Sequence, residues 1–328
     1  ENMSGKSFLF VRPRRFGKSL WLNVLRHYYD LAMADRFDAL FGDLDIGKNP
    51  TPLHNRYFVM TWNFSRIDPR GTVDEIADRM NETLNSVVED FSDEYDEFLP
   101  TGIRIRPQVI DTLAGLLRVI AKTPYKLYLL VDEYDNFANE VMASDETAYK
   151  GLVRKEGPLK TLYKGLKDLM ENSVLDRIFV TGVSPVVMSD ITSGANIFKN
   201  LYLRKEYNAL CGFTQEEITG MLTEVADHCG LPESSVGEAE EMMSLWYNGS
   251  RFSADSSVKV YNPTLALYFL DHLTETCQYP SQMLDSNLAA DEGKLEYMGR
   301  AVSGRQTVTD IFQKDEPLVI NALSDRFT

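Results

Sequence analysis

Cysteine and histidine are scarce in this chain of 328 residues, which has three cysteines and four histidines. Cys211, Cys229 and Cys277 are odd in number and widely spaced, so the sequence predicts neither a disulfide framework nor a zinc site. No run of about 18 apolar residues occurs, so no membrane span is predicted. No signal peptide is expected either, and the default expectation is a soluble cytoplasmic protein of a reducing compartment.

Basic residues are also in deficit. The chain has 34 Lys and Arg against 49 Asp and Glu, which gives a net charge of −15 and a pI of about 4.8. Such a surface repels the phosphate backbone, so direct nucleic-acid binding is not expected. Any anion must therefore be held by a local site rich in basic side chains or backbone amides.

The rest of the composition is that of a globular protein. With 44% hydrophobic and 25% charged residues, the chain is neither collagen, low-complexity disorder nor coiled coil. The length predicts two domains, or one large domain with an appendage.

Apolar runs alternate with helical patterns over the first two thirds of the chain. The runs predicted as strands are Lys6–Val11, Tyr57–Phe64, Lys126–Val131 and Arg177–Thr181, with Leu201–Leu203 as a short fifth. Several are apolar at nearly every position, which predicts a parallel sheet covered by helices on both faces. After Thr214 only helical patterns are evident, so we expect an α/β core over residues 1–213 and a helical lid over residues 214–328.

A phosphate-binding loop is predicted between the first strand and the next helix. Residues 12–19 read Arg-Pro-Arg-Arg-Phe-Gly-Lys-Ser and end like the P-loop motif, although Arg12 replaces its first glycine. Free amides at a helix N-terminus attract phosphate. Gly17 would allow close backbone approach, Lys18 would reach the β- and γ-phosphates and Ser19 would bind Mg²⁺. The predicted nucleotide-binding residues are Arg12, Pro13, Arg14, Arg15, Phe16, Gly17, Lys18, Ser19 and Leu20.

Two acids end the third predicted strand, in the run KLYLLVDEYDNF over residues 126–137. Asp132 is predicted to hold Mg²⁺ together with Ser19, and Glu133 to activate the attacking water as a general base. Asp135 is a third acid close by, which either orients a basic side chain or assists the metal. The alternative is an acidic turn without a catalytic role.

Polar residues also follow the fourth strand, and a further arginine follows the fifth. In a P-loop enzyme a polar residue at the neighbouring strand tip senses the γ-phosphate or positions the water. Thr181 and Ser184 are the candidates, with a plain strand-end turn as the alternative for each. Arg204 is the candidate arginine finger or lid contact, with a surface arginine as the alternative.

With these residues the chain resembles the AAA-ATPase-like family of bacteria and fungi, which is often fused to a C-terminal PD-(D/E)XK nuclease-like domain. The resemblance covers about residues 5–275, and the Arg-Pro-Arg-Arg-Phe start is itself typical of the family. Its blocks are residues 12–19, 131–135, 180–184, 210–214 with Glu216 and Glu217, 246–249 with Arg251 and Phe252, and 260–263.

The resemblance implies a P-loop NTPase of the additional-strand class, a three-layer sandwich with sheet order 5-1-4-3-2. It implies ATP and Mg²⁺ as cofactors, carried by Lys18, Ser19, Asp132 and Glu133. Related NTPase–nuclease pairs occur in secreted effectors of the Crinkler type, so a nuclear or secreted effector is the alternative to a cytoplasmic location. No nuclease acid pair with a following ExK occurs up to Thr328, so we expect any nuclease-like part outside this segment.

Several functions are compatible with these motifs. The preferred one is an ATPase whose cycle moves the helical lid and controls an effector domain. The alternatives are a nucleotide switch that hydrolyses slowly or not at all, a phosphotransferase, and a nucleic-acid-binding module. The Asp-Glu pair suits water activation better than phosphotransfer, and the net charge disfavours nucleic acid. A homo-oligomer with a neighbour's arginine in the site is a further expectation.

Overall fold

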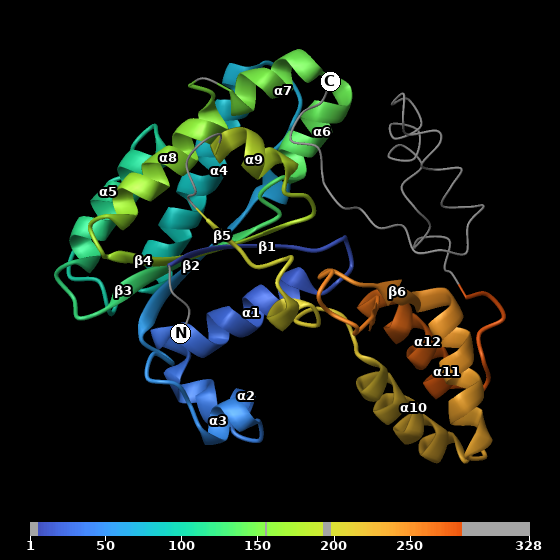
Figure 1. The fold of residues 1–328 in the computed structure, drawn as a ribbon. Helices are drawn as coiled ribbons and strands as arrows, with labels where there is room; N and C mark the ends of the chain where they lie inside the picture. The colour runs from blue at the N-terminus through green and yellow to red at the C-terminus, as the bar shows by residue number, and fades with distance from the viewer. Residues whose placement is uncertain (1–5, 155, 193–197, 284–328) are drawn as a thin grey trace. The chain divides into compact units, whose positions relative to one another are not determined.

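The computed structural model describes residues 6–154, 156–192 and 198–283 (Figure 1). Its larger sheet has five parallel strands in the order β2-β3-β4-β1-β5, which is the predicted order 5-1-4-3-2 read from the other edge. The predicted α/β fold class is therefore confirmed. The strands are β1 (Ser7–Val11), β2 (Tyr57–Asn63), β3 (Lys126–Asp132), β4 (Leu175–Gly182) and β5 (Lys199–Asn200).

Helices cover both faces of this sheet and make it the middle of three layers (Figure 1). Helix α1 (Lys18–Tyr29) lies on one face, and α4 (Val73–Glu94), α5 (Val109–Ile120) and α8 (Pro158–Met170) lie on the other. The connecting helices are η1 (Leu31–Arg36), α2 (Phe37–Phe41), α3 (Asp45–Lys48), η2 (Phe64–Arg66), α6 (Asn136–Ser144), α7 (Glu146–Val153) and α9 (Val186–Thr192). Within the described ranges, no helix is long and apolar enough to cross a membrane.

The central strand β3 shows why this sequence forms a buried parallel sheet. Every residue from Leu127 to Asp132 is buried between β2 and β4, as expected for a strand covered on both faces. In the same sheet Val11 pairs with Gly182, and Val131 with Val180. The carboxyl ends of β1, β3 and β4 therefore meet at one edge, where the predicted motifs follow them.

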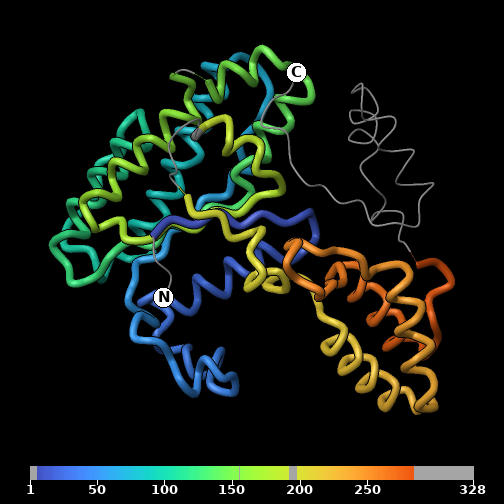
Figure 2. Tube along the Cα trace, in the orientation of Figure 1, coloured from blue at the N-terminus to red at the C-terminus, as the bar shows by residue number. Residues whose placement is uncertain are grey.

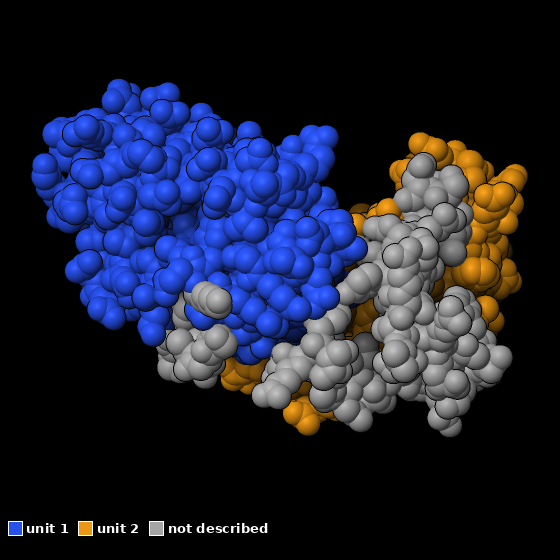
Figure 3. All heavy atoms as spheres, turned by 90° about the horizontal axis from the view of Figure 1, so that it is seen from above, with its two compact units in different colours: residues 1–13, 18–202 blue, residues 14–17, 203–328 orange. Residues whose placement is uncertain are grey.

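The chain divides into two compact units (Figure 3). The first comprises residues 1–13 and 18–202, and the second comprises residues 14–17 and 203–328. In the second unit α10 (Gln215–Cys229), α11 (Ser234–Tyr247) and α12 (Pro263–Thr276) share an apolar core, and their paths can be followed in Figure 2. The short helix η3 (Lys205–Tyr207) precedes them. Residues 284–328 of the predicted lid lie outside the described ranges.

Side-chain caps fix where these helices begin. Thr214 and Glu217 form a capping box at the start of α10. At α12 the side chain of Asn262 accepts hydrogen bonds from the amides of Thr264 and Leu265, and Pro263 fills the first helical position.

Two strand predictions are wrong. The fifth strand lies at Lys199–Asn200, not at Leu201–Leu203. Its two residues are polar, and they form a strand only through backbone pairing with β1, so no apolar pattern marks it. The second unit also contains an antiparallel pair, β6 (Asn248–Ser250) and β7 (Val260–Tyr261), where no strand was predicted. Strands of two or three residues are too short to produce an apolar pattern.

The prediction that the cysteines form no disulfide is also wrong. Cys229, at the end of α10, is bonded to Cys277, the C-cap of α12, across a Cα–Cα distance of 5.4 Å. Cys211 is buried and is not part of a disulfide. Sequence spacing does not reveal that two distant helix ends meet, which is why the pair was missed.

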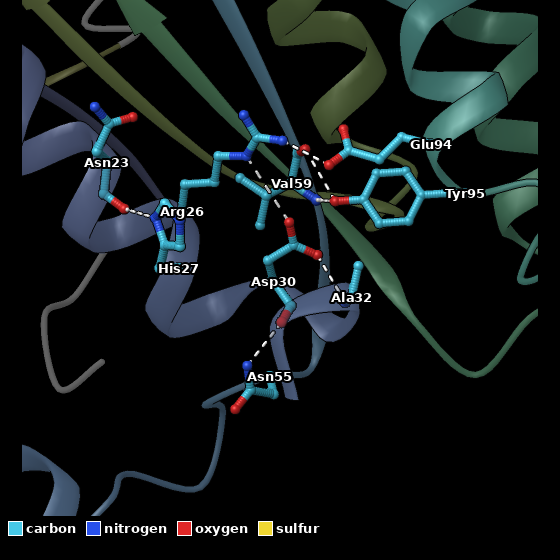
Figure 4. Close-up of polar contacts among 9 residues, drawn as sticks. All are labelled: Asn23, Arg26, His27, Asp30, Ala32, Asn55, Val59, Glu94 and Tyr95. Atoms are coloured by element: carbon cyan, nitrogen blue, oxygen red, sulfur yellow. Dashed lines mark hydrogen bonds and ion pairs between the residues drawn. The ribbon is translucent and has the colours of Figure 1, made fainter. Parts of the chain in front are cut away.

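A buried carboxylate follows α1 at the amino edge of the sheet (Figure 4). Asp30 has no exposed surface, and its Oδ1 accepts a hydrogen bond of 2.8 Å from the amide of Ala32. Its Oδ2 lies 3.9 Å from Nε of Arg26, whose Nη2 donates to Glu94 at 2.6 Å. Burial raises the pKa of Asp30, while the Ala32 amide, the Tyr95 hydroxyl and Arg26 oppose this shift and Glu94 adds to it.

We expect Asp30→Asn to stabilise the protein at neutral pH. Because the folded pKa of Asp30 lies above its ordinary value of 3.8, the unfolded chain loses this proton first as the pH rises. The free energy of unfolding therefore falls through the window from 3.8 up to the folded pKa and stays lower above it. Asparagine removes this loss and keeps an acceptor for the Ala32 amide.

The measurement is urea unfolding of both proteins at several pH values from about 4 to 7. The stability of Asp30→Asn minus that of the wild type should increase with pH. Asp93→Asn, at an exposed acid on α4, serves as the control and should show a smaller change. A difference that decreases with pH would mean that the attraction to Arg26 outweighs burial.

Candidate functional site

The segment between β1 and α1 contains two residues with a left-handed backbone. Arg15 and Gly17 have positive φ angles of 69° and 79°, whereas Phe16 between them does not. Glycine adopts this conformation without a steric penalty, whereas arginine does so under strain. Such alternation turns successive backbone N–H groups towards one side, as in many phosphate sites.

Lys18 opens α1, and its side chain folds back along this loop. Its Nζ donates a hydrogen bond of 3.0 Å to the carbonyl oxygen of Pro13. The residue is buried, so the ammonium group stays close to the loop backbone. This is the place where the sequence predicts the β- and γ-phosphates.

Asp132, at the carboxyl end of β3, joins residues from three elements. Its Oδ2 accepts a hydrogen bond of 2.5 Å from Oγ of Ser19 on α1. Its Oδ1 accepts one of 2.6 Å from Oγ1 of Thr181 on β4 and one of 3.0 Å from the amide of Glu133. The structure thus brings together the residues predicted as metal ligands, Ser19 and Asp132, and one of the two predicted sensors.

Glu133 stands on strained backbone directly after Asp132. Its φ is 50°, and a residue other than glycine in this region costs about 1–3 kcal/mol. Its Oε2 accepts a hydrogen bond of 2.8 Å from Nδ2 of Asn136, the first residue of α6. Oδ1 of Asn136 is buried and has no hydrogen-bond partner among the described residues. Asn136 is not among the site residues predicted from the sequence, although it lies in the same acidic run.

Asp135, the third acid, forms no hydrogen bond with Ser19 or Asp132 among the described residues. Its fully buried carboxylate accepts hydrogen bonds from the amides of Val183 and Ser184 and from Nδ2 of Asn139. Burial raises the pKa of Asp135, and the hydrogen bonds from Ser184, Val183 and Asn139 oppose the shift. Asp135 therefore binds the turn between β4 and α9.

Ser184, the other predicted sensor, also takes part in this turn. Its Oγ accepts a hydrogen bond of 3.2 Å from the amide of Val186, the first residue of α9. The hydroxyl therefore caps the first residue of α9, and its predicted role in sensing the γ-phosphate or positioning the water stays a prediction.

Arg12 is placed differently from a typical phosphate ligand. Its guanidinium is buried, donates through Nη1 to the carbonyl oxygens of Val11 and Tyr202, and lies 4.3 Å from the ring centre of Phe10. Its backbone amide donates to Gly182. These contacts fix the end of β1, and a direct phosphate contact by Arg12 stays a prediction.

Other predicted residues belong to the second unit or point to solvent. Within the second unit, the ring of Phe16 meets that of Phe252 edge-on at 5.3 Å, and Thr264 donates to the carbonyl of Arg15. Arg204 is partly exposed and forms an ion pair with Glu206. Pro13 and Arg14 are exposed, and Leu20 on α1 is 68% exposed. Their predicted roles remain predictions.

The predicted metal ligands fit Mg²⁺ by their chemistry. The part of the chain that the structure describes contains no cluster of three or more His, Cys, Asp or Glu side chains suited to a metal. Mg²⁺ in phosphate-transfer sites takes only one or two protein ligands, and waters and phosphate oxygens complete its shell. The hydroxyl of Ser19 and the carboxylate of Asp132 are such oxygen ligands.

A hollow of about 750 Å³ lies elsewhere in the first unit, at the amino ends of β2 and β3. Its lining includes Asp35, Asp38, Arg56, Glu97 and Tyr125. None of these belongs to the predicted motifs, and parallel strands place their amino ends opposite the edge that holds Asp132. In doubly wound folds ligands bind at the carboxyl edge, so we place the candidate site there.

The sheet order and its covering helices define an α/β sandwich of the P-loop NTPase type. A family described as "Predicted AAA-ATPase" matches residues 2–192, which is more than half of the chain, so the chain belongs to this AAA-ATPase-like family. The resemblance seen in the sequence is confirmed. Family membership indicates nucleotide binding in general terms.

One curated relative is described as "Uncharacterized protein in vnfD 5'region" from Azotobacter chroococcum mcd 1. It is 24% identical over 261 residues, which cover 79% of this chain and 44% of the relative. The chain therefore spans less than half of the length of that relative. No solved structure matches the chain.

Proposed function

We propose that the carboxyl edge of the sheet binds ATP with Mg²⁺ and hydrolyses the bond to its γ-phosphate. The observation that carries this proposal is the pair of short hydrogen bonds from Ser19 and Thr181 to Asp132, at 2.5 and 2.6 Å. In P-loop NTPases the loop Ser or Thr and the acid at the end of another strand of the same sheet share the metal. Here these two residues already lie in contact.

The other residues have distinct roles in this proposal. Lys18 offers its ammonium to the β- and γ-phosphates in exchange for its hydrogen bond to Pro13. Mg²⁺, when bound, neutralises the charge that develops on the phosphate oxygens. Thr181 holds Asp132 in place, and the amides of residues 15–17 face the phosphates.

Hydrolysis uses Glu133 as the base. A water oxygen bonds to the γ-phosphorus, and the proton of that water passes to the carboxylate of Glu133. The bond from the γ-phosphorus to its bridging oxygen breaks, and its electron pair stays on ADP. The products are ADP and inorganic phosphate.

In our proposal the second unit acts as the lid and transmits the nucleotide state to a C-terminal nuclease-like or other effector domain. The supporting observation is that loop residues Arg15 and Phe16 contact Thr264 and Phe252 within the second unit. In this proposal, a change in the loop conformation on nucleotide binding alters these contacts inside the second unit. A homo-oligomer with an arginine from a neighbour remains part of the proposal.

A nucleotide switch with little or no hydrolysis is the second candidate. The hydrogen bond from Asn136 to Glu133 favours it, because it occupies Oε2 of Glu133 and holds the carboxylate against the start of α6. If Asn136 restrains the base, Asn136→Ala should raise the ATP turnover rate several-fold while the affinity for ATP stays unchanged. A lower turnover rate would instead show that Asn136 orients Glu133 productively.

Nucleotide-dependent stability tests the binding step that both candidates share. With ATP and Mg²⁺ at 100 times the dissociation constant, the free energy of unfolding should rise by about 2.7 kcal/mol. Lys18→Ala should show no such rise, whereas Lys122→Ala, which replaces an exposed lysine, should match the wild type. If neither ATP nor GTP stabilises the wild type in the presence of Mg²⁺, both candidates are rejected.

A further inference from the structure

The turn after β4 is held by the two residues that follow Glu133. The amide of Ser184 donates 2.8 Å to Oδ2 of Asp135, and the amide of Val183 donates to Oδ1 and Oδ2 at 3.1 and 3.2 Å. The hydroxyl of Tyr134 donates 2.6 Å to the carbonyl oxygen of Ser184. It also accepts a hydrogen bond of 3.2 Å from the amide of Met188 on α9.

Gly182 makes this close contact possible. A Cβ atom built on Gly182 would lie 2.5 Å from Oδ1 of Asp135 and 2.5 Å from the ring of Tyr134. No side chain fits in that space, so the backbone of the turn lies directly against the two side chains. The amide of Tyr134 also donates 3.1 Å to the carbonyl oxygen of Thr181. The end of β4 is thus tied to residues 134 and 135 on both sides of Gly182.

Thr181 connects this turn to the candidate metal ligand. Its side chain is fully buried, and its Oγ1 donates to Asp132 at 2.6 Å. The position of that hydroxyl is set by the backbone of Thr181 and Gly182, which Asp135 and Tyr134 hold. Among the described residues, Asp135 forms no hydrogen bond with Ser19, Asp132 or Glu133.

We propose that Asp135 is a positioning residue for ATP hydrolysis, which holds the β4–α9 turn so that Thr181 keeps Asp132 oriented towards Ser19. The proposal rests on the proposed function of this edge. It assigns Asp135 no contact with nucleotide or metal, unlike the two roles considered from the sequence. Its requirement for an acid follows from its partners, because Val183, Ser184 and Asn139 are all N–H donors.

The test compares turnover per nucleotide-binding site in Asp135→Asn and the wild type. Asparagine has the same size but places an NH₂ group opposite one of the N–H donors, which loosens the turn. We expect kcat to fall by about 10- to 100-fold, with KM for ATP within about threefold. Asp190→Asn is the matched control, since Asp190 on α9 accepts its hydrogen bond from Tyr149 of α7. It should keep kcat within about twofold.

A double-mutant cycle separates positioning from a merely structural role. Thr181→Val removes the hydroxyl on which Asp135 is proposed to act. The double variant Asp135→Asn/Thr181→Val should therefore be no slower than Thr181→Val alone. If the two losses multiply, or if Asp135→Asn keeps the wild-type kcat, the proposal is overturned.

Two further outcomes are informative. If Asp135→Asn does not fold, Gly182→Ala takes its place, because the added Cβ displaces the same carboxylate. Gly182→Ala should show the same loss of kcat, and the double variant Gly182→Ala/Thr181→Val should be no slower than Thr181→Val alone. If the wild type binds and hydrolyses no nucleotide, the proposed function fails and this inference fails with it. A wild type that turns over, beside an Asp135→Asn of equal kcat, refutes the inference alone.

Discussion

Glu133→Gln should bind ATP like the wild type and hydrolyse it about 10²- to 10⁴-fold more slowly, which is the usual contribution of a general base. Glutamine has nearly the same shape and still accepts the hydrogen bond from Asn136, so the local structure should persist. It cannot take the proton of the attacking water. The strained backbone of Glu133, with φ at 50°, is the structural reason to expect a role in function at this position.

The measurement is phosphate release under single-turnover conditions, beside ATP binding measured by calorimetry. Glu140→Gln, at an exposed position on α6, is the matched control and should keep the wild-type rate. If Glu133→Gln hydrolyses ATP as fast as an active wild type, Glu133 is not the base. If both proteins bind ATP and neither turns it over, the switch is the better description.

Much of the fold was predictable because buried parallel strands carry a strong signal. Lys126–Asp132 is apolar at five successive positions, and the structure buries every one of them. The helix predicted after the phosphate-binding loop begins at Lys18, and the first helix of the region after Thr214 begins at Gln215. A loop motif marks the first of these starts, and a capping box marks the second. Local chemistry alone was enough for these elements.

Other elements depend on contacts that no local pattern contains. The residues of β5, Lys199 and Asn200, become a strand only because β1 lies beside them. Cys229 and Cys277 are 48 residues apart and meet because α10 and α12 pack together. Neither feature leaves a periodic trace in the sequence.

The candidate site was predictable to the level of motifs but not of contacts. The spacing of Ser19 and Asp132 in the sequence does not state that they share a hydrogen bond, whereas the parallel sheet brings their elements to one edge. The sequence leaves two roles open for Asp135, because its partners Val183 and Ser184 follow the end of another strand. Such partners follow from strand order, which only the three-dimensional fold supplies.

Removal of the disulfide should give a large change in stability. Cys229→Ala/Cys277→Ala should lower the free energy of unfolding of the second unit by about 4 kcal/mol, because the closed loop of 48 residues restricts the unfolded chain. Hydrogen exchange of peptides from α10 and α12 measures this change, since their slowest amides report the stability of the unit that contains them. Peptides from β3, in the first unit, should exchange as in the wild type.

Chemical reduction of the disulfide is an independent test of the same prediction. A thiol reductant should destabilise the oxidised wild type to the level of Cys229→Ala/Cys277→Ala, and it should leave that double variant unchanged. Cys211→Ser, which keeps the disulfide, should still respond to reductant. Three alkylatable thiols in the denatured, unreduced wild type would show that the pair is not bonded. The protein would then stabilise its second unit through the shared apolar core of Ile218, Met243 and Phe269 without a covalent link between the ends of α10 and α12.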